Sequence, residues 1–294
     1  MPVCHIRLAE INIRLEALDK RLFNAATAVF HPALHQKTAV WDINISLSNQ
    51  TKFSQLNRID FVDEDIGFGL QKDHNLFQFH FDIGAQFEVN IESGAIHGRI
   101  HPQAICFLED MLYLCLSPLL RQSDVFLLHG FAAQRDNQTI ILVGPSGCGK
   151  TTAGLALLIQ GWRFLANDIV LLKHDAIMIH PTFDRIRVRE GTPKLLGQPD
   201  AQLSFDSFLL GSTGGVTAVY FMELDATGET SVQPLPKAVA LAKLCEASVD
   251  RWDSNWLPSH FAFLKRLCKE TAVYQLTSGQ NIHQLYKKLH PHQN

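Results

Sequence analysis

The sequence TIILVGPSGCGKTT, residues 139–152, decides the fold. Its apolar run at 140–143 has the composition of a buried β-strand and ends at Gly144. The residues that follow fit the pattern G-x-x-x-x-G-K-[ST] of a phosphate-binding loop: Pro145, Ser146, Gly147, Cys148, Gly149, Lys150, Thr151 and Thr152. An apolar segment at 152–159, closed by Gly161, then has the length and composition of a helix. Strand, loop and helix therefore come in the order that a nucleotide site requires.

The residue types in this loop match the chemistry of phosphate binding. Gly144, Gly147 and Gly149 allow backbone conformations that other residues rarely adopt, so successive N–H groups can converge on a phosphate. The helix that begins near Lys150 points its positive end at the same anion. The Lys150 ammonium can reach the β- and γ-phosphates, and the Thr151 hydroxyl can ligate Mg²⁺. We therefore predict that residues 144–152 bind a nucleotide together with Mg²⁺.

The composition is that of an ordinary globular chain. It has 294 residues, of which 46% are hydrophobic and 19% are charged, so there is ample material for a core. The formal net charge of −3 gives no general affinity for nucleic acid. No apolar run approaches the roughly 20 residues that a membrane span needs, and residues 1–21 have no signal-peptide core. We therefore expect a cytoplasmic protein without nucleic-acid or membrane partners.

The six cysteines are scattered and none forms a C-x-x-C pair, which is typical of reduced thiols. Cys148 lies inside the loop, near the start of the predicted helix. It is either an oxidation-sensitive thiol or a small side chain at a tolerant loop position, and we prefer the second interpretation.

Two domains are predicted, a β-rich region at 1–101 and a nucleotide-binding domain at 102–294. Apolar spacing at 8–30 predicts an amphipathic helix, although Ile11 and Ile13 also fit a strand. Phe77, Phe79 and Phe81 alternate with polar residues, so we expect them to pack in the core of a half-buried sheet. A helix is expected at 103–120, and a hairpin from 125 to 143 leads into the loop.

Three arginines follow the predicted strands at 163–166 and 169–173. Arg185, Arg187 and Arg189 alternate with apolar residues, so an extended segment would present three guanidinium groups on one face. Guanidinium groups suit phosphate or carboxylate, and a solvated strand face is the alternative. We place Arg187 among the candidate catalytic residues. The glycine-rich stretch at 191–215 is predicted to be a mobile loop.

An acidic residue beyond the loop determines the reaction, because it holds the metal or activates the nucleophile. Asp168 ends the strand that follows the loop helix, and Glu223 follows an apolar run of the kind found in general ATPases. The residues alone do not choose between these two candidates.

The segment from His129 to Asp168 resembles the catalytic core of the HPr kinase/phosphorylase family, bacterial enzymes that phosphorylate a serine on a carrier protein. The likeness covers about 40 residues and includes a His-Gly pair, a hairpin, the phosphate loop, an apolar helix closed by glycine, and finally Ala166-Asn167-Asp168, where the family has A-D-D. Fifteen positions separate His129 from Gly144 and eighteen separate Lys150 from Asp168, and both spacings match the family. Residues 1–101 look like the β-rich region of the family's stand-alone relatives.

The resemblance implies an α/β fold, with the phosphate loop on a mixed, twisted sheet of the HPr kinase and phosphoenolpyruvate carboxykinase type. His129 would lie near the γ-phosphate, and Lys150 with the loop amides would bind the phosphates. Thr151 and Asp168 would hold Mg²⁺. ATP would be the nucleotide, with GTP as the alternative, and the acceptor would be a protein or peptide. Relatives of this family often assemble, so a homo-oligomer is also considered.

The chain departs from the family at Asn167, where the family has the aspartate that takes the proton from the acceptor serine. An amide does not accept a proton as a carboxylate does, so Asp168 or His129 would have to act instead. Three functions follow in order of preference. The first is a kinase acting on a serine or another hydroxyl of a protein or peptide. The second is a nucleotide-binding module with little or no transfer. The third is a different ATPase that uses Glu223.

Overall fold

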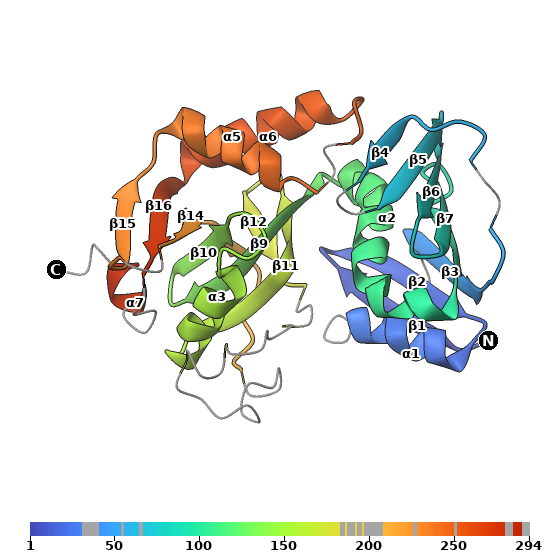
Figure 1. The fold of residues 1–294 in the computed structure, drawn as a ribbon, viewed down its shortest axis with the longest axis horizontal. Helices are drawn as coiled ribbons and strands as arrows, with labels where there is room; N and C mark the ends of the chain where they lie inside the picture. Colours follow the sequence, from blue (N-terminus) through green and yellow to red (C-terminus); the bar gives the residue numbers. More distant parts are fainter. Residues whose placement is uncertain are drawn as a thin grey trace. The chain divides into compact units, whose positions relative to one another are not determined.

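The computed structural model describes residues 1–30, 41–53, 56–64, 67–182, 186, 192, 196, 208–225, 228–249, 252–279 and 285–289. The chain forms two compact units, Met1–Val125 and Phe126–Asn294. Each unit is a mixed α/β structure built on its own eight-stranded sheet (Figure 1).

Within its described residues, the first unit has an eight-stranded sheet, two α-helices and a short 3-10 helix. The strands occur in the order β1-β2-β3-β8-β7-β6-β5-β4. β2, β3 and β8 run parallel to one another, and the other neighbours are antiparallel. The elements are β1 (Val3–Leu8), β2 (Ile11–Ala17), α1 (Lys20–Val29), β3 (Ile43–Asn49), β4 (Phe61–Asp63), β5 (Phe68–Asp73), β6 (Leu76–Phe81), β7 (Ala85–Asn90), β8 (Ala95–Ile100), η2 (Pro102–Phe107) and α2 (Leu108–Gln122).

One face of this sheet is buried and the other is polar. Along β6, Phe77, Phe79 and Phe81 are each at most 2% exposed, whereas the residues between them are half-buried. The same alternation occurs in β2, β3, β7 and β8, because successive side chains of a strand point to opposite faces. The expectation that the phenylalanine stripe packs in a core is confirmed.

The helix predicted at 8–30 is wrong over its first half. Residues 11–17 form β2, where Ile11, Ile13 and Leu15 share the buried face with a period of two. The helix begins only at Lys20, after Asp19 caps it by accepting a hydrogen bond from the Leu22 N–H at 3.0 Å. Along the sequence, the apolar residues of β2 and α1 taken together recur at spacings that are typical of a helix.

The helical stretch Pro102–Gln122 belongs to the first unit, whereas the predicted boundary at 101/102 placed it in the second. Both of its parts, η2 and α2, contact α1. The stretch is long and apolar enough by composition to cross a membrane, which the sequence analysis did not expect, but 72% of its most apolar window is buried as in a core helix. Pro118 has no N–H for the Leu114 carbonyl, and the Ser117 hydroxyl donates to that oxygen at 2.9 Å instead.

The second unit has its strands in the order β13-β12-β11-β9-β10-β14-β16-β15. β10, β14 and β16 are parallel neighbours, whereas β9 lies antiparallel to β10 on the other side. The elements are β9 (Val125–Arg135), β10 (Gln138–Val143), α3 (Lys150–Ile159), β11 (Arg163–Lys173), β12 (Met178–His180), β13 (Gly214–Gly215), β14 (Ala218–Leu224), β15 (Ser231–Pro234), α5 (Lys237–Ala247), α6 (Leu257–Glu270), β16 (Ala272–Ser278) and α7 (Leu285–Lys288).

Helices cover both faces of the second sheet (Figure 1). One core contains residues of α5 and α6 packed on side chains such as Val143 and Phe221. The other core contains residues of α3 and α7 packed on side chains such as Leu142 and Met222. Neighbours along β10 and β14 therefore point to opposite cores, and the phosphate loop leaves the sheet between two packed layers.

We predict that Gly154→Ala destabilises the second unit. Alanine favours a helix over glycine by about 1 kcal/mol, but a Cβ at this position of α3 would overlap the ring of Phe131. Overpacking of a core typically costs about 1–3 kcal/mol, so the overlap outweighs the helix propensity. Chemical denaturation should show a lower free energy of unfolding. When Phe131 is also changed to leucine, Gly154→Ala should cost less free energy of unfolding, because the smaller side chain relieves the overlap. If the effects of the two substitutions on the free energy of unfolding simply added, the overlap would be contradicted.

Candidate functional site

The loop between β10 and α3 has the backbone of an anion-binding loop. Gly147 and Gly149 have φ angles of 83° and 92°, which side chains other than glycine's rarely permit. A Cβ on Gly144 would lie 2.8 Å from both the Met222 carbonyl oxygen and Cys148 Sγ, so only glycine fits there. Among the described residues, the N–H groups of Ser146, Gly147 and Gly149 make no hydrogen bond. These donors are available to a phosphate at the start of α3.

Lys150 folds back over its own loop. Its ammonium donates to the Gly144 carbonyl at 2.8 Å and to the Pro145 carbonyl at 3.1 Å, and the residue is 7% exposed. A buried ammonium requires such acceptors, because leaving a charge unpaired costs far more than a hydrogen bond contributes. A phosphate at the loop would offer charged acceptors in exchange for these neutral carbonyls. The role of Lys150 in binding the β- and γ-phosphates stays a prediction.

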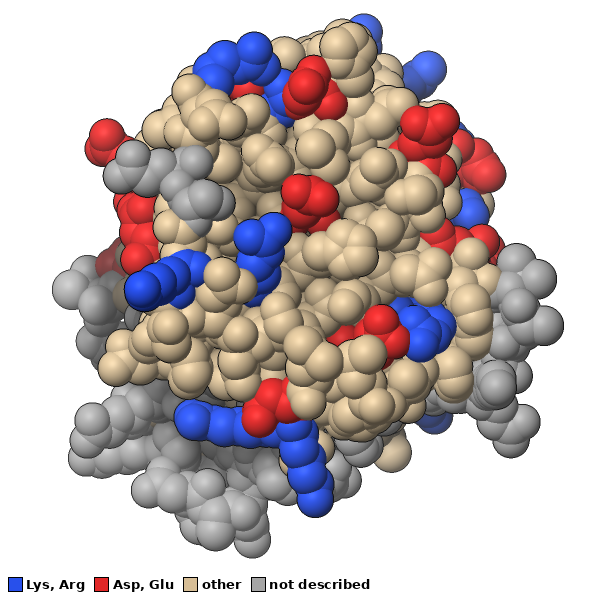
Figure 2. Space-filling model, turned by 90° about the vertical axis from the view of Figure 1, so that its right-hand side faces the viewer, with Lys and Arg blue, Asp and Glu red and all other residues tan. Residues whose placement is uncertain are grey.

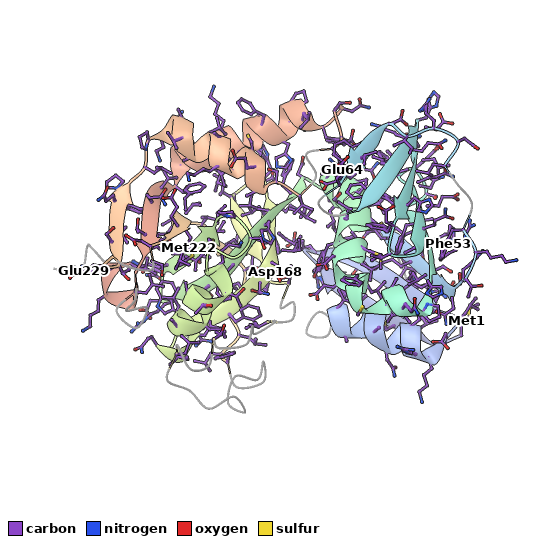
Figure 3. The ribbon with its side chains drawn as sticks, viewed as in Figure 1. Met1, Phe53, Glu64, Asp168, Met222 and Glu229 are labelled. Atoms are coloured by element: carbon purple, nitrogen blue, oxygen red, sulfur yellow. The ribbon has the colours of Figure 1, made fainter. Side chains whose placement is uncertain are left out.

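Thr151, Asn167 and Asp168 form a hydrogen-bonded chain at the start of α3. The Thr151 hydroxyl donates to Asn167 Oδ1 at 3.1 Å, and Asn167 Nδ2 donates to Asp168 Oδ2 at 2.9 Å. Asn167 is 1% exposed. Asp168 lies in the middle of β11, in the second unit (Figure 3), with a φ of 65° that is unusual for a residue with a side chain.

The two strands predicted at 163–166 and 169–173 are one strand, β11. The left-handed backbone of Asp168 interrupts the regular pleat of β11, but the strand continues beyond this residue. Sequence reasoning expected a strand end at Asn167 and Asp168 because both residues favour turns. The pairing of β11 with its neighbours β12 and β9 keeps this segment in the sheet instead.

His129 lies in the middle of β9 and is the half-buried residue among eight buried neighbours at 125–133. In the antiparallel pairing of β9 with β10, Gly130 lies opposite Val143, the last residue of the loop strand. His129 therefore comes level with the start of the loop. A Cβ on Gly130 would approach the Leu142 carbonyl oxygen to 2.9 Å, so the histidine is followed by a residue that lets the strands pack closely.

Glu223, the alternative acidic residue, faces away from α3. It lies near the end of β14, next to the loop strand, and its carboxylate accepts from Lys243 Nζ of α5 at 3.1 Å. Met222 packs in the core under α3, so its neighbour Glu223 points to the side of the sheet that carries α5. Lys243 was not identified from the sequence, where a lysine in a helix carries no distinguishing signal.

The donor set fits a nucleotide with Mg²⁺. Mg²⁺ prefers oxygen ligands and takes only one or two carboxylates from a protein, with phosphates and water as its other ligands. The hydroxyl of Thr151 and the carboxylate of Asp168 are linked through Asn167 beside the free loop amides. Within the described ranges, no group of three His, Cys, Asp or Glu residues could hold a metal by itself. Arg185, Arg187, Arg189 and most of the predicted loop at 191–215 lie outside the described residues.

Cys148 is 6% exposed, and its sulfur faces Gly144 within the loop. This burial supports the interpretation of a small side chain that fills the loop.

Comparisons with known proteins give short or distant similarities. No protein-family model matches the chain. A stretch of 51 residues is 45% identical to the spermidine/putrescine import ATP-binding protein PotA 1 of Pseudomonas aeruginosa, and a stretch of the same length and identity matches PotA of Pseudomonas fluorescens. Each match covers 17% of this chain and 13% of the relative, so the chain spans about an eighth of the curated relatives' length.

Among solved structures, the Hpr(Ser) kinase/phosphatase from Coxiella burnetii aligns with 55% of this chain and 92% of its own, at 14% identity and a TM-score of 0.30. A TM-score this low does not establish a common fold. The short matches to two ATP-binding proteins are in keeping with the P-loop sequence of this chain, and its mixed α/β fold rests on its own structure.

Proposed function

We propose that this protein is an ATP- and Mg²⁺-dependent phosphotransferase that passes the γ-phosphate to a serine, or to another hydroxyl, of a protein or peptide. The observation that carries the proposal is the chain Thr151–Asn167–Asp168 beside the lysine of the phosphate loop. A nucleotide-binding loop alone needs no such acidic partner at the start of its helix. Phosphoryl transfer does, because charge must be neutralised while the acceptor is held in line.

In this proposal each residue of the site has one task. The loop amides and Lys150 bind the phosphates, and Lys150 neutralises charge that develops on the transferring group. Thr151 and Asp168 hold Mg²⁺, which supplies further neutralisation when bound. His129 lies near the γ-phosphate, and Arg187 is proposed to approach the same group. The proton of the acceptor hydroxyl goes to Asp168 or to His129.

The second candidate is a nucleotide-binding module that transfers slowly or not at all. Asn167 favours it, because its amide nitrogen donates to Asp168 at 2.9 Å and its amide oxygen is already an acceptor for Thr151. No carboxylate stands at position 167 to accept a proton, and Asp168 shares its own oxygen with the amide. ATP is the nucleotide in both candidates, in keeping with the ATP-binding names of the short matches.

The function is tested by incubating the purified protein with γ-labelled ATP, Mg²⁺ and a lysate of the organism that encodes it. Label that moves to a discrete protein or peptide, and does not move with the Lys150→Ala variant, establishes a kinase and identifies its acceptor. Tight ATP binding without transfer or phosphate release supports the binding module. Absence of ATP binding overturns both candidates.

We predict that Asp168→Asn and Glu223→Gln have different effects. Asp168→Asn should lower Mg²⁺-dependent transfer by roughly 10²–10³-fold, the range for losing one charge-stabilising group in a site. Glu223→Gln removes the ion pair between Glu223 and Lys243. The Glu223 side chain is 56% exposed, and exposed ion pairs contribute about 0–1 kcal/mol to stability. Its turnover should therefore stay within about a few-fold of the wild type. The opposite ranking, measured as phosphate release, would identify the third alternative, an ATPase that uses Glu223.

A further inference from the structure

The polar face of the first unit's sheet carries a cavity of about 190 Å³, which is independent of the nucleotide site. Its floor is formed by β6, β7 and β8, and its wall by the segment before β4. This volume is somewhat above the roughly 150 Å³ of an engineered cavity that holds benzene. It is below the roughly 300 Å³ at which drug-sized sites begin. The cavity therefore suits a small molecule or one residue of a peptide.

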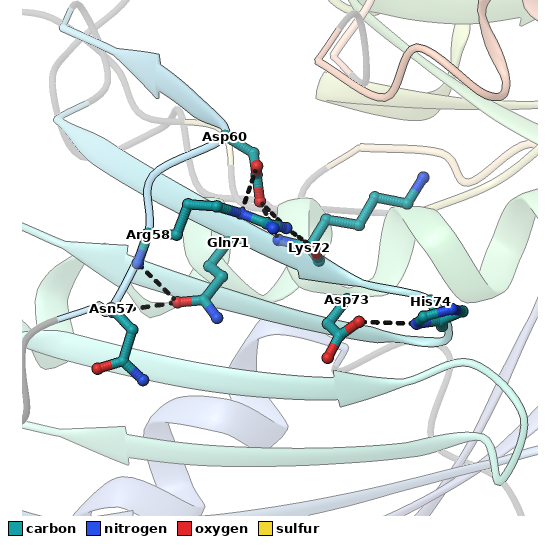
Figure 4. A network of polar contacts seen from close by, with 7 residues as sticks. All are labelled: Asn57, Arg58, Asp60, Gln71, Lys72, Asp73 and His74. Carbon is teal, nitrogen blue, oxygen red and sulfur yellow. Dashed lines mark hydrogen bonds and ion pairs between the residues drawn. The ribbon is translucent and has the colours of Figure 1, made fainter.

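The wall of the cavity is held in place by hydrogen bonds (Figure 4). The N–H groups of Asn57 and Arg58 both donate to Gln71 Oε1 of β5, at 3.1 and 3.2 Å. Asp60 accepts from the Lys72 N–H at 2.8 Å and pairs with Arg58 at 2.8 Å. The backbone N–H of Lys72 and then the Arg58 side chain lower the pKa of Asp60, so this carboxylate stays charged.

Leu56 of the wall packs over β5. A Cβ on Gly69 would lie 3.7 Å from the Leu56 side chain, which is an ordinary contact distance. The wall is therefore built against the sheet from both its polar and its apolar side chains.

The floor carries one positive and one negative charge that do not pair with each other. Arg99 and His97 of β8 are exposed, and neither makes a hydrogen bond or an ion pair within the described part of the chain. Arg99 lies opposite Gln86 and His97 lies opposite Glu88, so the two charges are diagonal neighbours. Diagonal neighbours on adjacent antiparallel strands lie about 7–8 Å apart. The Glu88 carboxylate accepts a long hydrogen bond of 3.4 Å from Gln78 Nε2.

Both charges line one cavity, so a single ligand bound there would meet a guanidinium and a carboxylate. A guanidinium binds a carboxylate through two parallel hydrogen bonds, and a carboxylate accepts from an ammonium. With histidine counted as neutral, the lining has no net charge, which favours a zwitterion over a phosphate dianion.

We propose that this cavity binds a small zwitterion of the amino-acid class, with its carboxylate on Arg99 and its ammonium on Glu88. Gln78 and Gln86 border the same space and supply amide donors and acceptors. Leu56 provides an apolar side chain, whereas Phe79 and Phe87 border the cavity from strand positions whose side chains belong to the buried face. The site is separate from the phosphate loop and does not depend on the proposed function.

The test is saturation-transfer NMR on the full chain with a pool of the twenty L-amino acids. At least one member should give a signal, and titration of that member should show about a tenfold to hundredfold weaker affinity for Arg99→Gln and for Glu88→Gln, as expected for one lost charge-assisted contact. The matched control is Arg7→Gln, which removes an exposed arginine from β1, at the far edge of the same sheet. It should leave the affinity unchanged.

Several outcomes would overturn the site. These are the absence of any signal from the pool, a signal that Arg99→Gln leaves intact, and a signal that inorganic phosphate displaces. ATP affinity measured on the same variants separates this proposal from the proposed function. Arg99→Gln should bind ATP as the wild type does, and a chain that binds amino acids but not ATP would contradict only the proposed function.

Discussion

Lys150→Ala is expected to abolish phosphoryl transfer and to weaken ATP binding by about tenfold to a hundredfold. The ammonium is the buried cation of the phosphate loop, and it is held 2.8 Å from the Gly144 carbonyl. Its loss removes charge-assisted hydrogen bonds to the phosphates in the ground state. It also removes a group that neutralises charge during transfer, so activity should fall by a further factor of roughly 10²–10³.

The measurement is isothermal titration with ATP and Mg²⁺, followed by the labelled-ATP assay. The same titration on Lys243→Ala serves as the control, because that lysine is in an ion pair with Glu223 on the other side of the sheet. Thermal unfolding should show that both variants are folded. Alanine at position 150 leaves the Gly144 and Pro145 carbonyls without the lysine, but Pro145 is exposed, so water can reach them. Transfer that persists in folded Lys150→Ala would refute the assignment of the loop.

Asn167→Asp is expected to raise phosphoryl transfer, or to create it, and to make the stability of the second unit depend on pH. A carboxylate at 167 restores a group that accepts a proton from an acceptor hydroxyl. It also faces Asp168, whose oxygen now lies 2.9 Å from the Asn167 amide nitrogen. Two carboxylates so close raise the apparent pKa of the pair above its value in the unfolded chain.

The direction of the pH effect follows from that raised pKa. A carboxylic acid whose pKa is higher in the folded state binds its proton more tightly there, so the pair is best tolerated at low pH. Relative to the wild type, Asn167→Asp should lose about 1–3 kcal/mol of stability as the pH rises through the folded-state pKa. Mg²⁺ should restore part of that loss, because a divalent cation between the carboxylates replaces the missing amide donor.

Denaturation at mildly acidic and mildly alkaline pH, with and without Mg²⁺, measures this effect independently of activity. Asn24→Asp, at an exposed position of α1, is the matched control and should show neither change. A variant that gains the pH dependence but no transfer would favour the nucleotide-binding module. A variant with neither property would show that Asn167 does not control Asp168.

Much of the second unit was predictable because its elements are local. The strand at 140–143, the glycine loop and the helix after it depend on short-range features: an apolar run, residues that tolerate positive φ, and a helix start. The alternation of Phe77, Phe79 and Phe81 likewise predicted a buried sheet face, because side chains in a strand repeat with a period of two.

Errors arose where a distant contact overrides a local preference. Residues 11–17 contain leucine and isoleucine at helical spacings, yet they pair with β1 and β3. Asn167 and Asp168 favour a turn, yet β11 continues through them because the strand is paired between β12 and β9 in the sheet. The helix at 108–122 follows a proline that resembles a domain start, but its buried face belongs to the first unit.

The sequence by itself determined that this chain has a phosphate-binding loop and which lysine and threonine serve it, because their spacing within one loop sets the chemistry. Only the tertiary structure decided how Glu223 and Asp168 differ. The first faces Lys243 on one side of the sheet, whereas the second is linked through Asn167 to the start of α3 on the other. That choice depends on which face of a strand a side chain occupies and which helix packs there, and both are properties of the assembled sheet.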